Sequence, residues 1–338
     1  MRILVSLLAV LVLLLAAWAG TSLADSAPTR ALFGVALPWA AVLVFTGGFV
    51  GRIVLWARSP VPFRIPTACG QQKSLPWIRN APLDNPHTKA GVVGRMALEV
   101  LLFRSLFRNT KAEVRNGRVI QGTTVWLWAG ALLFHACFAV VLLRHVRFFL
   151  DPVPAPVLWL VRLDALMEVG VPALFMSGAG LVAGALFLLL RRLAIPQVRY
   201  FSLPADYFPL FLILGIATTG ILLRHFVRAD ITGVKELAMN LAGLDFTAAV
   251  EGIHWLAYAH LTFVSVLVIY FPFSKLMHMG GVFLSPTRNM ANNNRRVRHV
   301  NPWDYPVPVH TYAEYEEEFR DKMEAAGLPL EKEPVGPR

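Results

Sequence analysis

Four histidines lie at two fixed spacings inside two long apolar segments of this 338-residue chain. His135 and His145 have nine residues between them, and His260 and His278 have seventeen. Neutral imidazole is a good iron ligand, and ionisable side chains within an apolar span usually mark a functional site. Two histidine pairs on two helices therefore predict two iron sites with two imidazole ligands each. This is the ligand pattern of a membrane protein that carries two haems of the b type.

The composition is that of an integral membrane protein, since 56% of the residues are hydrophobic and only 16% are charged. The net charge of +11 arises from basic residues beside apolar spans, and no nucleic-acid-binding motif accompanies them. We therefore exclude nucleic acid as a partner. The two cysteines, Cys69 and Cys137, form neither a Cys-x-x-Cys-His haem-attachment motif nor an iron–sulfur ligand set. Axial ligands and packing alone would hold the haems.

Apolar stretches of about 20 residues predict an all-α fold with five to six transmembrane helices. Residues 1–25 fit either a cleaved signal peptide or a first transmembrane helix, and we favour the retained helix. The further predicted spans are 31–57, 123–149, 165–190, 206–224 and 255–279.

The distribution of basic residues predicts which side of the membrane each connection occupies. The connections 58–122 and 191–204 and the segment from 275 to the end together hold twenty-three Lys and Arg residues, whereas the opposite side holds seven. Because basic residues accumulate on the cytoplasmic side, these connections and the C-terminus are expected to be cytoplasmic. The expected location is a bacterial cytoplasmic membrane, with lipid around the spans.

We divide the chain into four parts by these patterns. Residues 1–25 are followed by a span and a basic loop (26–118), a four-helix core with the histidines (119–285) and a cytoplasmic tail (286–338). In the loop, residues 92–107 predict a helix that lies in the membrane interface or packs on the protein. In the tail, Thr311 and Glu314 predict a capped helix with an aromatic stripe, which docks on a partner subunit or folds back on the chain.

The pairing of the histidines follows from the opposite directions of the two spans. Antiparallel packing places His145 opposite His260 near the outer surface, and His135 opposite His278 near the inner one. His260 and His278 lie five whole turns apart and share one helix face. The separations along the two helix axes differ, about 15 Å against about 27 Å, and a kink at Pro272 would absorb part of the difference.

Other polar residues near the outer ends of the spans are further site candidates. Arg144 and Arg147 flank His145 and would contact haem propionates or anchor the helix at the interface. His225 is a candidate quinone-site residue, and an interfacial position is its alternative. Asp164 and Glu168 would take protons from a quinol, or serve as the acidic first turn that helices favour.

The segments around the histidines resemble the gamma subunit family of respiratory nitrate reductase, a cytochrome b with two haems. The likeness rests on His135 with His145, on His260-Leu-Thr-Phe, and on Phe271-Pro-Phe-Ser-Lys-Leu-Met-His278, and it covers about 120–285 with 31–57 as the first span. The long loop, the N-terminal apolar segment and the tail depart from that subunit. Residues 93–108 and 310–314 instead resemble the DsrM-type membrane subunit of the complex associated with dissimilatory sulfite reductase.

This resemblance implies a subunit that passes electrons between the quinone pool and a cytoplasmic iron–sulfur subunit resembling heterodisulfide reductase, within a larger complex. The implied cofactors are two haems b, with quinone or quinol as substrate, and the chain would be the electron-transfer subunit of an oxidoreductase. A nitrate reductase gamma subunit is the alternative within the family. A proton-coupled transporter and a bare membrane anchor are alternatives of other classes.

Overall fold

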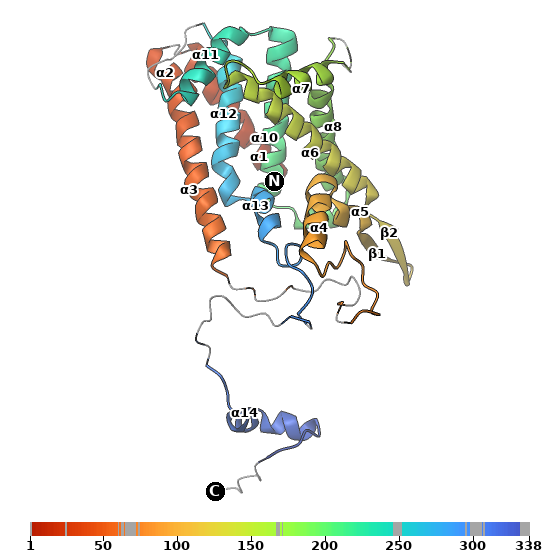
Figure 1. Ribbon diagram of the computed structural model, residues 1–338. Helices are drawn as coiled ribbons and strands as arrows, with labels where there is room; N and C mark the ends of the chain where they lie inside the picture. The colour runs from red at the N-terminus through yellow and green to blue at the C-terminus, as the bar shows by residue number, and fades with distance from the viewer. Residues whose placement is uncertain are drawn as a thin grey trace.

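The structure is a computed structural model that describes residues 2–23, 26–59, 61, 64, 72–73, 75–166, 170, 172–245, 252–294, 296–297, 306 and 308–331. Within these residues, six helical stretches are long and apolar enough to cross a membrane, which agrees with the predicted all-α membrane fold (Figure 1). The stretches are Arg2–Leu23, Ala27–Ala57, Val125–Phe148, Met176–Ala194, Pro204–Val227 and Trp255–Phe273.

The α-helices are α1 (Arg2–Trp18), α2 (Ala27–Ala31), α3 (Leu37–Ala57), α4 (Lys89–Leu102), α5 (Arg104–Arg108), α6 (Val125–His145), α7 (Ala155–Ala165), α8 (Met176–Ala194), α9 (Pro196–Phe201), α10 (Pro204–Ile221), α11 (Ile231–Ala242), α12 (Trp255–Tyr270), α13 (His278–Gly281) and α14 (Tyr312–Ala325). Shorter 3₁₀ turns are η3 (Val146–Phe148), η5 (Phe271–Phe273), η6 (Lys275–Met277) and η7 (Val282–Leu284). The π-helical turns are η1 (Ala19–Leu23), η2 (Leu32–Ala36) and η4 (Leu222–Val227). The strands are β1 (Thr110–Arg115) and β2 (Arg118–Thr123).

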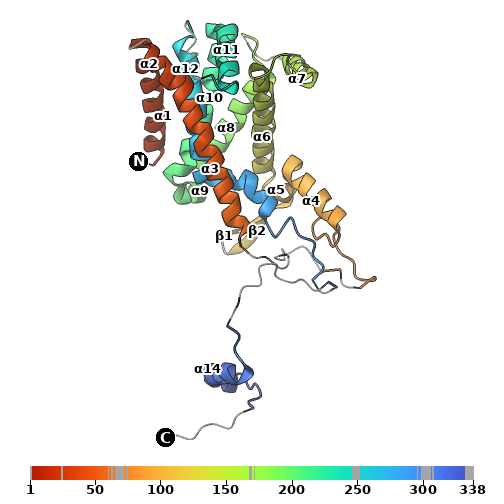
Figure 2. The same ribbon diagram turned by 60° about the vertical axis from the view of Figure 1, so that its left-hand side comes forward.

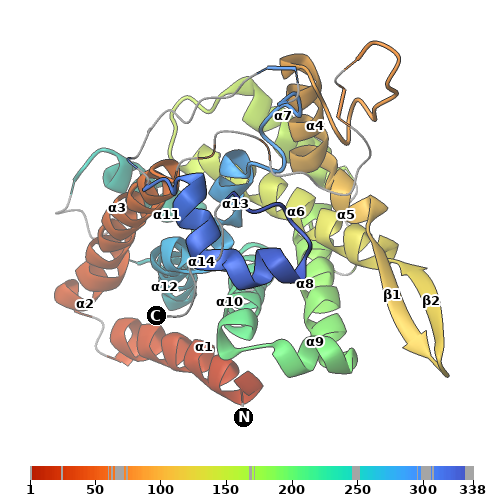
Figure 3. The ribbon, with the colours of Figure 1, turned by 90° about the horizontal axis from the view of Figure 1, so that it is seen from below.

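The two ends of the bundle carry different elements. Helices α4 and α5 and the β1–β2 hairpin lie at one end, the hairpin end, whereas α7 and α11 lie at the opposite, far end (Figures 1 and 2). The view from below shows the hairpin projecting sideways from the bundle (Figure 3). Each end therefore has its own set of surface elements beside the spans.

Glycines allow α6 and α8 to approach closely. A Cβ atom at Gly184 would lie 2.9 Å from the Cα of Phe134, and one at Gly180 would lie 2.5 Å from the Sγ of Cys137. Gly180 and Gly184 form a small-x-x-x-small pattern, which favours close helix packing in membranes. Cys137 thus packs at this helix contact as a small apolar side chain, while Cys69 lies outside the described residues.

The packing leaves the two histidine helices apart. Helix α6 packs on α8, and α12 packs on α10, α3 and α1, but α6 and α12 have little or no direct backbone contact. Apolar side chains of α1, α6, α8, α10 and α12 form the main core, with Phe263 and Leu212 almost completely buried. Neighbouring helices therefore hold α6 and α12 in place without bringing their backbones together.

The fourth span begins at Met176, so the predicted span 165–190 was wrong at its start. The preceding residues form the separate helix α7 at the far end. Asp164 at the end of α7 accepts hydrogen bonds from the backbone N–H of Ser177, 2.8 Å away, and from its hydroxyl. This carboxylate satisfies a free N–H of the first turn of α8, the role of a helix cap.

The last span ends earlier than predicted, because α12 stops at Tyr270 and a 3₁₀ turn with Pro272 follows. Proline lacks the N–H that would continue the α-helical hydrogen bonds. Pro272 is buried against Gly48 of α3, where a Cβ would come within 2.8 Å. His278 therefore begins the short helix α13, and the prediction that it shares one continuous helix face with His260 was wrong.

The loop before α6 contains two helices where one, over residues 92–107, was predicted. Phe103 adopts a left-handed conformation, with φ of 50°, and separates α4 from α5. Arg95 and Glu99 of α4 are buried, so this helix packs on the protein. The Asp84 carboxylate accepts hydrogen bonds from Arg104 and Arg108, and the one from Arg104 chiefly keeps the Asp84 pKa below its usual value.

The β1–β2 hairpin was not predicted, although the sequence contains its signal. Asn116 and Gly117, both with positive φ, form the turn between Arg115 and Arg118. Asn-Gly is the preferred pair for a two-residue hairpin turn. The strands pair in antiparallel register, with Val114 opposite Val119. A short sheet thus accompanies a fold that is otherwise helical in its described residues.

The tail contains the predicted capped helix. Thr311 and Glu314 form a capping box at the start of α14, which lies away from the bundle in Figure 1. Tyr312 and Tyr315 are exposed, whereas Met323 is buried. The aromatic side of α14 is therefore only partly covered by its own chain.

Replacing Gly184 by alanine should destabilise the protein by about 1–3 kcal/mol, because the added methyl group meets backbone atoms of α6. The midpoint of thermal unfolding in detergent measures this effect. Gly47→Ala is the matched control in α3, since nothing lies within 4 Å of a Cβ there. Equal midpoints for the two variants would contradict the close approach of α6 and α8.

The lowered Asp84 pKa predicts an acid-sensitive loop. A carboxyl group whose pKa is depressed by folding stabilises the folded form above its unfolded pKa of about 3.9, and this contribution disappears as pH falls. Amide protection factors in α4 and α5 should therefore fall as the pH drops below about 4. Asp84→Asn should show low protection factors that do not fall further with pH. A pH-dependent fall in the variant as large as that in the wild type would show that Asp84 is not its cause.

Candidate functional site

The structure brings the four predicted histidines together as two pairs, one toward each end of the bundle. The ring centres of His135 and His278 lie 6.1 Å apart, at the hairpin end. The ring centres of His145 and His260 lie 6.3 Å apart, toward the far end. These are the neighbours that antiparallel packing led us to expect, while the role of the four side chains as haem ligands stays a prediction.

Each imidazole uses its Nδ1 atom in a hydrogen bond within the chain. His135 bonds to the carbonyl of Ala131 (2.8 Å), His145 to that of Val141 (2.7 Å) and His278 to that of Lys275 (2.9 Å). Nδ1 of His260 lies 2.9 Å from the Thr219 hydroxyl, which can itself donate to the carbonyl of Gly215. A carbonyl partner fixes the proton on Nδ1, so the Nε2 lone pair stays available to a metal.

The spacing of both pairs fits one metal ion between two imidazoles. An imidazole nitrogen binds a metal at about 2.0 Å and lies about 1.1 Å from the ring centre, so ligands on opposite sides have ring centres roughly 6.2 Å apart. Both observed separations agree with this value. The described residues contain no group of three or more His, Cys, Asp or Glu side chains that could hold a bare metal ion. Haem iron needs only two axial protein ligands, so the donor set fits haem.

Local packing sets the position of the His278 imidazole. Helix α13 lies against α3, and Cβ atoms at Gly280 and Gly281 would come within 3.0 Å of Ile53 and 3.4 Å of Trp56. The side chain of Ser274 caps the turn before His278 by accepting the N–H of Leu276. The two glycines and the capped turn therefore fix the position of His278, which lies beyond the last span.

Arg144, a predicted propionate contact, has partners within the protein itself. It forms an ion pair with the buried carboxylate of Asp164 and a 3.0 Å hydrogen bond to Ser177. Its guanidinium also lies 4.0 Å from the ring centre of Phe175. The same ion pair and the cap on α8 engage Asp164, whose predicted role as a quinol proton acceptor stays a prediction.

Arg147 and Arg224 are different, because no carboxylate of the described residues forms an ion pair with either. Arg147 lies over the ring of Phe148, and Arg224 lies 5.7 Å from the ring centre of Phe175. Arg147 follows His145 by two residues. Arg147 and Arg224 are therefore better placed than Arg144 to bind an anionic group at the far end.

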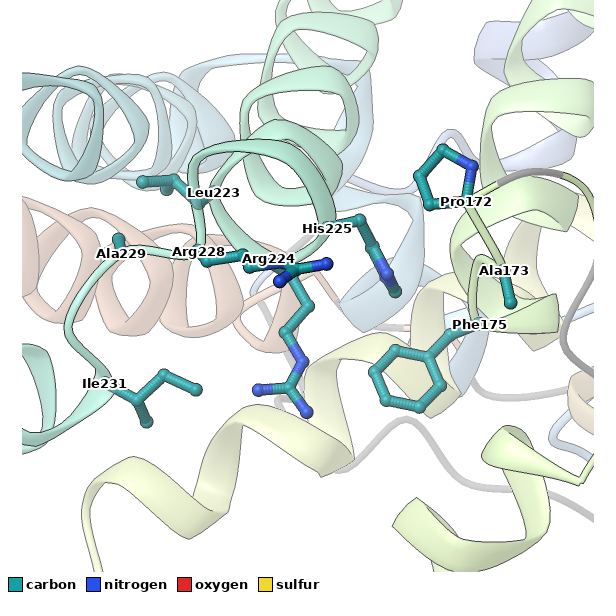
Figure 4. Close-up of a pocket in the computed structure, with 9 residues that line it drawn as sticks. All are labelled: Pro172, Ala173, Phe175, Leu223, Arg224, His225, Arg228, Ala229 and Ile231. Carbon is teal, nitrogen blue, oxygen red and sulfur yellow. The ribbon is translucent and has the colours of Figure 1, made fainter.

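A cavity of about 460 Å³ opens at the far end between the start of α8 and the end of η4. Figure 4 shows His225 and Phe175 on one side and Arg224 and Arg228 nearby. The rings of His225 and Phe175 meet edge to face with centres 5.4 Å apart. Arg224 and His225 belong to a π-helical turn, a feature frequent at functional sites.

Of the remaining candidates, Glu168 lies outside the described residues. Sequence reasoning missed Thr219 and Phe103, which contact His260 and His135. Thr219 is distant in sequence from His260 and has no local signal. Phe103 belonged to a predicted helix, but the sequence did not indicate the break that turns its ring toward His135.

Comparisons with known proteins agree with this architecture. The profile of the nitrate reductase gamma subunit family matches residues 96–299. The Hdr-like menaquinol oxidoreductase cytochrome b-like subunit of Archaeoglobus fulgidus is 48% identical over 279 residues, which cover 81% of this chain and 83% of that protein. The protein of the same description from Archaeoglobus profundus is 41% identical over 275 residues, 80% of this chain and 82% of its own length. The chain belongs to the nitrate reductase gamma subunit family.

Proposed function

We propose that this protein is a membrane cytochrome b subunit with two haems, which passes electrons between the quinone pool and a cytoplasmic partner. The observation that carries this proposal is the spacing of the two histidine pairs, each with its Nδ1 atoms engaged within the chain. His135 and His278 would hold the inner haem, and His145 and His260 the outer one. Haem supplies reversible one-electron transfer, and two axial histidines leave no iron position for a substrate.

The direction across the membrane rests on charge. Helices α4 and α5 and the hairpin, which belong to the basic loop 58–122, lie at the hairpin end, so we infer that this end is cytoplasmic and the far end outside. The protein would then be a multi-pass protein of the prokaryotic cytoplasmic membrane with its C-terminal tail inside. Helix α1 packs its Val10 and Ala17 into the cores of the bundle, which supports its retention as a span.

We assign the quinol site to the far-end cavity. His225 is suited to accept a hydroxyl proton from a quinol, and the aromatic ring of Phe175 offers a surface for the quinol ring. Arg224 and Arg228 would hydrogen-bond a quinol oxygen. Phe175 also contacts Arg144, the sequence neighbour of His145, so the cavity lies near the end of α6 that carries the outer pair of histidines. Menaquinol, which appears in the names of both relatives, is the quinol we propose.

The partner at the hairpin end would be an iron–sulfur subunit resembling heterodisulfide reductase. The names of the two relatives contain "Hdr-like", which favours such a complex over a nitrate reductase. A role in dissimilatory sulfur metabolism follows from the resemblance of residues 93–108 and 310–314. We propose that α14, with its exposed Tyr312 and Tyr315, contacts this partner.

A transporter for metal ions is the weaker candidate. A bare metal ion requires three or four protein ligands, whereas the described histidines meet only in pairs. A bare anchor would not need four imidazoles with engaged Nδ1 atoms. The geometry therefore favours an electron carrier.

Replacing members of the histidine pairs should remove haems one at a time. His135→Ala or His278→Ala should leave about one haem per chain, and so should the double variant, because both residues bind one iron. His135→Ala combined with His260→Ala should leave none. The pyridine haemochrome assay measures haem content, and His87→Ala, outside the pairs, is the control. If the His135/His260 variant keeps one haem, the pairing is incorrect.

Replacing His225 by phenylalanine should weaken quinol binding and keep the ring contact with Phe175. Loss of one hydrogen bond of about 1.4 kcal/mol should raise the KM for a menaquinol analogue about tenfold. The rate of haem reduction by the analogue provides the measurement. Phe226→Leu, at an exposed neighbouring side chain outside the cavity lining, is the control. An unchanged KM for His225→Phe would place the quinol site elsewhere.

A further inference from the structure

Phe103 has an unusual backbone for a large side chain. Its φ of 50° and ψ of 45° lie in the left-handed region, between α4 and α5. Bulky residues avoid this region, and such strain persists only where the surrounding structure enforces it. The conformation therefore indicates that the surrounding structure fixes the position of the Phe103 ring.

The ring of Phe103 contacts a proposed haem ligand. Its centre lies 5.0 Å from that of His135, and the two ring planes make an angle of 86°. Phe134 makes a second contact with His135, at 5.0 Å and 85°. The hydrogen bond from Nδ1 to Ala131 is a third restraint. Two aromatic rings and one hydrogen bond thus fix the plane of this imidazole.

The turn that carries Phe103 is tied to α6, the helix of His135. The indole N–H of Trp128 donates to the carbonyl of Leu102 at 2.7 Å, and the Thr124 hydroxyl donates to that of Leu106 at 2.9 Å. Glu99 accepts the N–H of Ser105 at the start of α5. The hydrogen bonds from Thr124 and Trp128 therefore hold the segment around Phe103 against the start of α6, the helix that carries His135.

The two histidine pairs differ in the angle between their rings. The planes of His135 and His278 are nearly perpendicular, at 84°, whereas those of His145 and His260 are nearly parallel, at 13°. His145 has a looser aromatic neighbour, Phe148, at 5.7 Å and 49°. The perpendicular pair is thus the one that Phe103 and Phe134 restrain.

We propose that Phe103 is a positioning residue for the inner haem, which holds His135 crosswise to His278. The inner haem then has crossed axial imidazoles, while the outer haem has nearly parallel ones. This inference rests on the proposed function, because it requires that both histidine pairs bind haem iron. It adds that the two haems are electronically distinct, and it names one of the side chains responsible.

The ring angle has a direct spectroscopic consequence. The π orbital of an imidazole interacts with the iron d orbital that lies perpendicular to the ring plane. Parallel rings raise one such orbital above its partner, which gives a ferric spectrum with three resolved g values. Crossed rings act equally on both orbitals and leave them nearly degenerate, so the signal becomes strongly anisotropic with one dominant low-field feature.

Electron paramagnetic resonance of the oxidised, full-length protein tests the inference. The wild type should show one strongly anisotropic and one rhombic low-spin signal. His278→Ala should abolish the anisotropic signal, and His145→Ala the rhombic one. Absence of haem from the wild type would refute the proposed function itself. Two bound haems with a rhombic inner signal would refute only the crossed geometry.

Variants at Phe103 distinguish the effect of its ring from that of its backbone conformation. Phe103→Asn removes the ring, and asparagine tolerates the left-handed conformation. Its anisotropic signal should shift toward the rhombic form while the outer signal stays unchanged. Phe103→Tyr keeps the ring and should retain the wild-type spectrum. Phe107→Leu is the control in α5, since Phe107 packs on Trp128.

An inner signal in Phe103→Asn identical to that of the wild type would overturn the positioning role. If Phe103→Asn loses the inner haem, Phe103→Leu is measured in its place. A shifted inner signal then supports the positioning role, and an unchanged one overturns it. A shift of the inner signal in Phe107→Leu equal to that in the Phe103 variant would also contradict the proposal, because a general loosening of α5 would then explain both.

Discussion

Four imidazoles, each with its Nδ1 atom bonded within the chain, are the constraint on which the rest of this structure depends. Three bonds go to backbone carbonyls and one to the Thr219 hydroxyl. A histidine at membrane depth is unfavourable unless its polar atoms have partners. These bonds engage Nδ1 of each ring and leave Nε2 as the nitrogen that could bind a metal. On our proposal, iron in a porphyrin would be the shared partner of the two Nε2 atoms of each pair.

The surrounding helices serve this constraint by holding α6 and α12 at a fixed distance. Glycines at the contact of α6 and α8 fix one histidine helix, and α10, α3 and α1 hold the other. The break at Pro272 moves His278 onto α13, where Gly280 lies against α3. The break also removes the mismatch in axial spacing that a straight helix from His260 to His278 would impose. The two pairs can then lie at comparable separations, 6.1 and 6.3 Å, toward opposite ends of the bundle.

The sequence predicted the features that depend on periodicity and direction. The six apolar spans, the capped tail helix and the neighbours of each histidine follow from local patterns and from antiparallel order. Features that depend on distant residues were not predictable: Asp164 caps α8 and pairs with Arg144 only through the fold. The helix end at Pro272 was interpreted as a kink, because sequence alone does not distinguish the two outcomes of a proline. The Asn116-Gly117 hairpin signal was present in the sequence but was overlooked.

The most direct measurement of the central claim is the location of iron in the purified protein by anomalous scattering at the iron absorption edge. Two peaks are expected, one between His135 and His278 and one between His145 and His260. No iron peak, or a single peak between His135 and His260, would contradict this account.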